Sequence, residues 1–205
     1  MGTFRFRIAA SGLAVALAFV AGAARAQTPP APVDPWLGVY LVPLGPVPPS
    51  VATDLVAQIK AKLGLTITVL PPLSIDPAAI DRDRVQVVAE ELVASLRRLP
   101  QHGSNLLMGL TTYDMYIRSV PQWEWAFSYR DGPRAVVVST ARMDDTNWGL
   151  PAAPDRLRTR LRKMVTKNLG LMYYGLSPSS DRRSVLFGPI LGLDDLDGIG
   201  DDFRP

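Results

Sequence analysis

The segment from residue 39 to residue 70 constrains the fold most, because it predicts a strand, a helix and a second strand in succession. Residues 39–42 are apolar, and residues 65–70 alternate apolar residues with threonine, as expected of strands. Between them, apolar residues recur at helical spacing; Ser50 is expected to cap this helix and Gly64 to end it. The folded part is therefore expected to open with a β-α-β unit.

The remaining pattern predicts further strands and helices in mixed order. A second amphipathic helix is expected after Asp83, with Val85 among its apolar positions, and an apolar strand over residues 105–111. Residues 125–129 and 135–140 predict a hairpin. A long helix from Asp155 to about Tyr174 is the last large element. The fold class is thus α+β: a mixed twisted sheet with two or three packed helices, a long late helix and an irregular C-terminal tail.

The N-terminus predicts export. Arg5 and Arg7 precede a short apolar stretch, and Ala24-Arg25-Ala26 provides a small-x-small cleavage site, so residues 1–26 are expected to be a secretory signal peptide. The stretch is shorter than the roughly 20 apolar residues that span a bilayer. An uncleaved anchor is the alternative. The mature chain is expected to be periplasmic or secreted, without stable membrane insertion.

The rest of the chain is expected to consist of a linker and one domain. Residues 27–35 are rich in proline, which fixes the backbone and favours an extended linker. Residues 36–205 carry no internal repeat and no second linker, and they are expected to form one domain.

Charge and cysteine content narrow the function classes. Loss of residues 1–26 removes three arginines and no acid, which takes the formal charge from +3 to zero. Without a basic excess, nucleic acid is not expected as a partner. The chain has no cysteine, so a hydrophobic core must hold the fold without disulfides, and no lipid can be attached through cysteine.

Five phrases carry a family resemblance across residues 37–197. They read VYLVPLG at residues 39–45, VLPPL at 69–73, GLTTYDMY at 109–116, STAR at 139–142 and WGLP at 148–151. In this order they resemble the archaemetzincins, a family of metzincin-like zinc proteases. The resemblance implies a metzincin-like fold, in which the long late helix is equivalent to the active-site helix that carries HExxHxxGxxH.

That motif has a physical reason for its spacing. Two histidines at i and i+4 share one helical face and bind one zinc ion, while the glutamate activates the zinc-bound water and a glycine turns the chain towards a third histidine.

In this chain the resemblance puts Lys167 and Leu171 at the first two histidine positions, Asn168 at the glutamate position, and Ser177 or Pro178 near the third histidine. None of these is a usable zinc ligand at neutral pH, and an amide cannot act as the base. Downstream, Leu186 matches the methionine of the methionine turn. We therefore expect a degenerate homologue, a pseudo-protease, with no catalytic residue, no metal and no cofactor.

The other candidate sites are expected to be solvent-exposed residues rather than binding sites. His102, the only histidine, is expected to be a solvated loop residue. The basic residues of the late helix are expected to form its wet face, with a patch for an anionic ligand as the alternative. A solvated tail is expected for the acidic C-terminal cluster, with calcium binding as the alternative. That cluster contains Asp194, Asp195, Asp197, Asp201 and Asp202.

Two hypotheses of function remain. The first is a non-catalytic binding or scaffolding protein that holds an extended peptide or protein partner along residues 125–129. The second is a peptidase or other hydrolase with a relocated, non-zinc site built from Asp114, Glu124, Lys167 and Asp181. Aromatic residues around the former cleft are the candidates for binding, although core packing is the default for such side chains. They are Trp123, Trp125, Tyr129, Trp148 and Tyr174.

Overall fold

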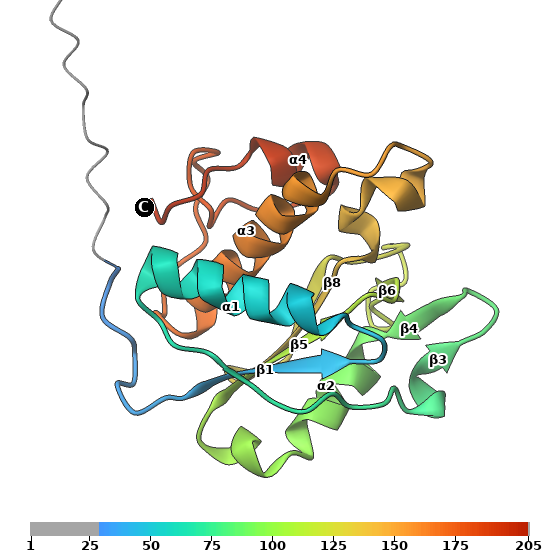
Figure 1. The fold of residues 1–205 in the computed structure, drawn as a ribbon, viewed down its shortest axis with the longest axis horizontal. Coiled ribbons are helices and arrows are strands. Elements are labelled where there is room, and N and C mark those ends of the chain that lie inside the picture. The colour runs from blue at the N-terminus through green and yellow to red at the C-terminus, as the bar shows by residue number, and fades with distance from the viewer. Residues whose placement is uncertain (1–28, 205) are drawn as a thin grey trace, which may run out of the picture.

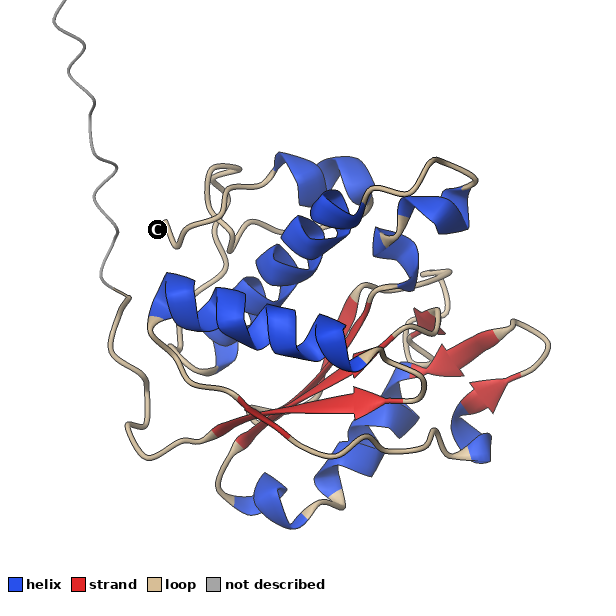
Figure 2. Ribbon diagram, in the orientation of Figure 1, coloured by secondary structure: helices blue, strands red, loops and turns tan. Residues whose placement is uncertain are grey.

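The computed structural model describes residues 29–204, so the expected signal peptide lies outside the described residues. Its main sheet has the strand order β2-β1-β5-β8-β7. The first four strands of this order run parallel, and β7 pairs antiparallel with β8 at one edge (Figure 2). The strands are β1 Val39–Leu44, β2 Thr68–Val69, β5 Leu106–Thr111, β7 Ser128–Arg130 and β8 Ala135–Ser139.

Helices cover both faces of this sheet. Helices α1 and α3 lie on one face and α2 lies on the other, while the short α4 packs beside α3 (Figure 1). None of the helices in residues 29–204 combines the length and the apolar character needed to cross a membrane. The helices are α1 Pro49–Leu63, α2 Ala89–Arg97, α3 Pro154–Met172 and α4 Leu193–Gly198.

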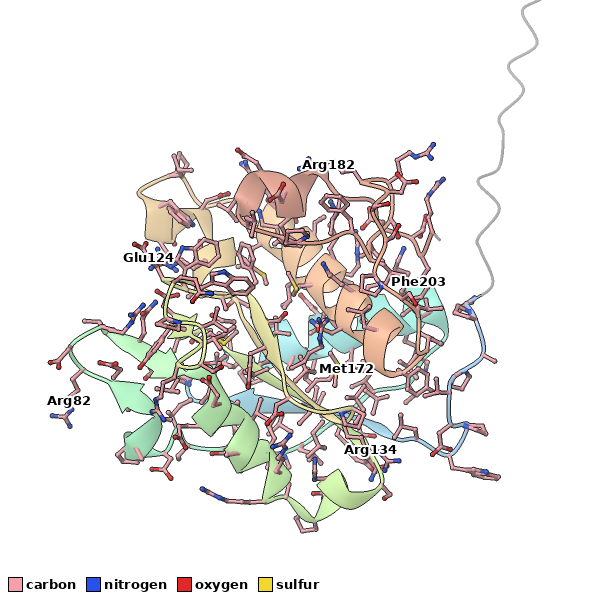
Figure 3. The ribbon with its side chains drawn as sticks, turned by 180° about the vertical axis from the view of Figure 1, so that it is seen from behind. Arg82, Glu124, Arg134, Met172, Arg182 and Phe203 are labelled. Atoms are coloured by element: carbon pink, nitrogen blue, oxygen red, sulfur yellow. The ribbon has the colours of Figure 1, made fainter. Side chains whose placement is uncertain are left out.

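A second, three-stranded sheet lies at one end of the molecule. Strand β4 (Gln86–Val88) pairs antiparallel with β3 (Ile80–Asp81) and parallel with β6 (Met115–Tyr116). The β3–β4 hairpin projects from the body, and Arg82 extends outwards from its tip (Figure 3).

Strand alternation divides the hydrophobic core into two layers. Leu41 and Met108 face α1 and α3, whereas Val42 and Leu107, their neighbours in the chain, face α2. All four side chains are buried. Both faces of the central strands are covered, which explains why these strands are apolar throughout rather than alternating with polar residues.

The α+β class and the β-α-β opening are confirmed, because β1 and β2 are parallel neighbours joined through α1. Ser50, in contrast, does not cap α1. The helix begins at Pro49 after Pro48, and no side chain makes the capping hydrogen bond. A proline at the first helical position serves instead, because it has no N–H group to satisfy.

The start of the second helix was also predicted wrongly. Val85 has a positive φ of 55° and lies in the turn between β3 and β4, so the helix cannot include it. Residues 86–88 form β4, and α2 begins only at Ala89. The apolar positions that predict one helix therefore belong to a strand followed by a helix.

The edge strand and the C-terminal tail both differ from the prediction. Strand β7 covers Ser128–Arg130 rather than residues 125–129, since the Ala126 amide donates to the Met115 carbonyl of β6 at 2.9 Å instead of continuing the main ladder. The C-terminal tail is not wholly irregular, because it contains α4. In the segment expected to be a linker, the Val33 amide donates to the Tyr173 carbonyl at 3.0 Å.

Candidate functional site

A pocket of about 350 Å³ lies between the sheet edge at β7 and helix α3. Residues 123–127, which lead into β7, form one wall, and residues 189–191 from the C-terminal segment form another. Its interior is mixed in character, with the apolar Phe127 and Met164 beside the polar Ser128, Arg130 and Lys167. A pocket that combines an apolar wall with a few convergent polar groups is the usual form of a binding site.

Lys167 extends from α3 into this pocket. Its Nζ donates a hydrogen bond to the Phe187 carbonyl, in the segment that follows Leu186. Burial, and secondarily the nearby Arg130 charge, lower the pKa of the Lys167 amine to about 8. A substantial fraction of this lysine is therefore neutral in mildly alkaline solution.

Asn168 and Arg130 join the helix to the edge strand. Asn168 is fully buried; its Nδ2 donates to the Met164 carbonyl at 2.9 Å, and its Oδ1 accepts from Arg130 NH1 at 3.2 Å. Arg130 is exposed as a residue, but its guanidinium turns towards α3, where desolvation lowers its pKa. Asn168 thus orients a cation of the edge strand.

Leu171 does not reach the pocket. It packs, half-buried, against the core cluster beneath α1 and α3, while Ser177 and Pro178 are exposed. Leu186 is buried under α3. A Cβ on Gly170 would come within 2.6 Å of Leu186 Cδ2, so the helix and this segment are in close contact.

The residues at these positions do not fit a zinc ion. Leucine has no donor atom, the Asn168 amide is occupied by Met164 and Arg130, and the Lys167 amine is hydrogen bonded to a carbonyl beside a second cation. Among residues 29–204, no group of three or more histidine, aspartate or glutamate side chains is gathered as a metal site would require. A dication would instead face two positive charges.

Of the five aromatic candidates, Trp123 and Trp125 line the pocket. Trp148 packs edge-on against Trp125, with ring centroids 6.2 Å apart, and extends this aromatic surface beside the pocket. Their role in binding stays a prediction.

Tyr129 and Tyr174 do not line the pocket. Side chains alternate along a strand, so Tyr129 points to the α2 face while Ser128 and Arg130 point to α3. Tyr174 is buried beyond the end of α3, where it packs against Tyr173 and Phe203, and this burial raises its pKa to about 12.

The four residues of the relocated hydrolase site are only partly brought together. Glu124 lies in the loop before β7 (Figure 3). It lines the same pocket as Lys167. Asp114 accepts hydrogen bonds from Arg142, at 2.6 and 3.0 Å, and from Gln86, whereas Asp181 is paired with Arg183 at 2.9 Å. Both aspartates are therefore engaged elsewhere.

The basic face of α3 and the acidic C-terminal cluster are largely each other's partners. Buried Arg160 donates to Asp145 at 2.8 Å and to Asp197 at 2.6 and 2.7 Å, and Asp197 raises the pKa of this guanidinium. Arg162 pairs with Asp201 at 2.8 Å. The expectation of a wet helical face is thus wrong for Arg160, and these pairs tie α3 to the C-terminal segment. The paired acids Asp197 and Asp201 remain solvent-accessible, as expected for the C-terminal cluster.

The positions of His102 and of two residues of β7 complete the comparison with the sequence predictions. His102 lies between α2 and β5, but in the short 3-10 helix Pro100–Gly103 rather than in a loop, and it is half-buried rather than fully solvated. Arg130 and Ser128 were missed as pocket residues. The strand periodicity contained the signal, because residues two apart share a face and Tyr129 faces the opposite way.

Searches by sequence and by structure both find archaemetzincins among the proteins similar to this chain. No family model matches the chain. It is similar to the archaemetzincins of Haloquadratum walsbyi and Haloarcula marismortui, with 27% identity over 154 residues and 28% over 155 residues. Each match covers 74% of this chain and 87% of the relative.

Solved structures share the fold. A zinc-dependent peptidase from Methanocorpusculum labreanum superposes with a TM-score of 0.70 at 20% identity, covering 82% of this chain and 96% of that one. The archaemetzincin of Archaeoglobus fulgidus, complexed with malonate, gives a TM-score of 0.66 at 20% identity, again covering 82% of this chain and 96% of that one. Sequence and structure comparisons together show that the chain is similar to the archaemetzincins and shares their fold.

Proposed function

We propose that this chain is an exported, non-catalytic relative of the archaemetzincins that binds an extended peptide or protein segment between β7 and α3. The observation that carries the proposal is the composition of α3, where Lys167, Asn168 and Leu171 stand at the positions that the family resemblance gives to two histidines and a glutamate. These side chains can neither bind zinc nor activate its water. Export is supported by the sequence pattern of residues 1–26.

The peptide-binding part is supported by the free side of β7. Ser139 N donates to Phe127 O and Asp131 N donates to Ala135 O, both at about 2.9 to 3.1 Å, so residues 127, 129 and 131 bond to β8. In an antiparallel pair the intervening residues, Ser128 and Arg130, direct their backbone groups away from the partner strand. A peptide can therefore add to the sheet there, and its side chains can enter the aromatic pocket.

Elemental analysis of the purified protein tests the non-catalytic part. We expect less than a stoichiometric amount of zinc, and no cleavage of casein or of peptide libraries with or without added zinc. Stoichiometric zinc that is lost on altering Lys167 and Asn168, or zinc-dependent cleavage, would refute this part. Cleavage without metal would favour the relocated hydrolase site.

A peptide array tests the binding part. We expect a subset of extended sequences to bind, and soluble versions of these peptides to compete with one another for a single site. Uniform absence of binding across the array would contradict this part, whatever the metal content.

A further inference from the structure

The cationic residues of α3 differ in one respect, the presence of a carboxylate partner. Arg156, Arg160 and Arg162 each lie within 3.1 Å of an aspartate oxygen. Lys163 donates instead to three carbonyls at the end of α4, at 2.7, 2.8 and 3.3 Å. In the described part of the chain, Lys167 forms no ion pair with an acid.

Arg130 is in the same position on the facing strand. It forms no ion pair within residues 29–204, and its side chain donates to the neutral Asn168 amide. Two cations thus line one pocket, close enough for the Arg130 charge to lower the pKa of Lys167. Desolvation acts in the same direction on both groups. Two neighbouring, desolvated cations are unfavourable until an anion joins them.

The pocket also leaves donors available. A lysine ammonium has three N–H donors and an arginine guanidinium has five, and each group uses one of them, on Phe187 O and Asn168 Oδ1 respectively. Trp125, Phe127 and Met164 place apolar walls beside these donors. Charge-assisted hydrogen bonds are stronger in such surroundings than in bulk water.

We propose that Lys167 and Arg130 form a carboxylate-binding subsite, through which the pocket between β7 and α3 selects acidic peptides. The proposal rests on the peptide-binding function for its occupant, and it names the chemistry that the occupant brings. Side chains of a strand added to β7 alternate between the two faces of the sheet, so every second one points to the α3 side, where both cations lie. The carboxylate comes from an aspartate or glutamate side chain or from a peptide C-terminus. Glu124 is the acid that the same pocket already contains, and it lies in the loop before β7.

The first experiment compares four hexapeptides with the purified protein by fluorescence anisotropy. Three are capped at both ends and carry glutamate, glutamine or lysine at the centre, and the fourth carries central glutamine with a free C-terminal carboxylate. We expect the glutamate peptide to bind about tenfold more tightly than the glutamine peptide, and the lysine peptide to bind worst. Tighter binding of the fourth peptide than of capped glutamine would assign the subsite to the C-terminus instead.

Variants assign the effect to the two cations. Lys167→Met and Arg130→Gln should each reduce the preference for glutamate over glutamine to less than about threefold, whereas Lys167→Arg should retain most of it. Lys60→Met, at an exposed site on α1, is the matched control and should keep the full preference. Unfolding midpoints measured in parallel identify any variant that has lost its structure.

A pH series adds a readout that a purely structural role would not change. The charged groups around the pocket are Lys167, Arg130 and Glu124. Bound carboxylate favours the protonated amine, so affinity for the glutamate peptide should fall above pH 8, near the pKa of free Lys167, while affinity for the glutamine peptide stays level.

The outcomes separate the two proposals. Equal binding of the glutamate and glutamine peptides would overturn the carboxylate subsite and leave peptide binding in place. If no peptide binds, NMR titration of the Lys167 amine with acetate decides. A pKa that rises with acetate supports the subsite and rejects the peptide as its occupant, whereas an unchanged pKa overturns both.

Discussion

At the scale of single residues, the substitution of one helical position changes which ligands the cleft can take. A histidine at position 167 would offer a neutral nitrogen to a metal ion, whereas Lys167 offers an ammonium held against Arg130. The pocket is therefore suited to anions, although the chain shares its fold with a zinc-dependent peptidase.

Lys167 should leave a signature in the pH dependence of stability. Its pKa is about 8 in the folded protein and 10.5 as the reference value for an unfolded chain, so the unfolded state binds more protons between these values. The free energy of unfolding should therefore rise as pH increases from about 8 to 10.5, relative to Lys167→Met. Allowing for solvent screening, the difference amounts to about 1 to 2 kcal/mol.

Denaturant unfolding of both proteins across this pH range measures the difference. Lys60→Met serves as the control, because that lysine is exposed and its removal should leave the profile parallel to that of the wild type. A Lys167→Met profile that also runs parallel to wild type would contradict the expected burial of the amine.

Arg160 should contribute more to stability than its neighbours on the same helix. Its side chain is 2% exposed and contacts Asp145, which is also 2% exposed, so Arg160→Met leaves a buried carboxylate without its closest cation. We expect a loss of about 3 to 5 kcal/mol in the free energy of unfolding. Arg158→Met, where the arginine side chain is 56% exposed, should cost less than about 1 kcal/mol. Chemical denaturation distinguishes the two, and similar losses would show that burial of the network is not decisive.

At the scale of elements, two close contacts position the cleft: α3 against the C-terminal segment, and β7 against β8. Gly170 makes the first contact possible, because a Cβ there would lie 2.6 Å from Leu186 and 2.7 Å from Phe203, which lies beside the end of α3 (Figure 3).

Gly170→Ala should therefore destabilise the protein by about 1 to 3 kcal/mol, even though alanine is the better helix former. Thermal unfolding measures the effect. Gly103→Ala is the control, since a Cβ at that site meets nothing within 4 Å. Gly170→Ala should cost less in a Leu186→Ala background than in the wild type, because the shorter side chain relieves the clash. An equal cost in both backgrounds would mean that Phe203 alone sets the limit.

The edge strand gives a direct test of strand addition. Ser128→Pro removes an N–H that points away from β8, so the sheet keeps its own hydrogen bonds while an added peptide loses one. Peptide affinity should fall about five- to tenfold, the equivalent of one hydrogen bond. Ser128→Ala keeps the N–H and should bind as the wild type does. Unchanged affinity in the proline variant would exclude pairing at this residue.

Some elements could be predicted from the sequence because their signals are local. The strand at residues 39–44, α1 and α3 have long, regular apolar patterns, and the structure has them within a few residues of the prediction. Strand β4 and helix α2 follow one another directly within a single amphipathic pattern, so the pattern alone does not separate them. The positive φ of Val85, which places it in the turn before β4, is not indicated by any propensity. The ends of β7 depend on competition between β6 and β8, a tertiary effect.

The same distinction applies to the candidate site. The lack of zinc ligands follows directly from residue identities. The pairing of Arg160 with Asp145 and Asp197 joins residues 15 and 37 positions apart, and Lys167 meets an arginine of another element. Contacts of this kind depend on the packing of α3 against the sheet and cannot be read from spacing.

At the scale of the whole molecule, export should fix where the mature chain begins. We expect N-terminal sequencing of the protein recovered from the producing cells to begin at Gln27, directly after the Ala24-Arg25-Ala26 site. The protein should be recovered from the periplasm or the medium. Recovery of the chain with residues 1–26 intact in the membrane fraction would support the anchor instead.

The cations beside β7 have a further consequence, for self-association. A short, unpaired strand edge is a place where two copies of a protein can join their sheets. Two β7 edges meeting in this way would bring the Arg130 and Lys167 charges of both copies together around one small interface, a repulsive arrangement. This repulsion should disfavour pairing between two β7 edges, whereas it would not oppose the acidic peptide proposed above.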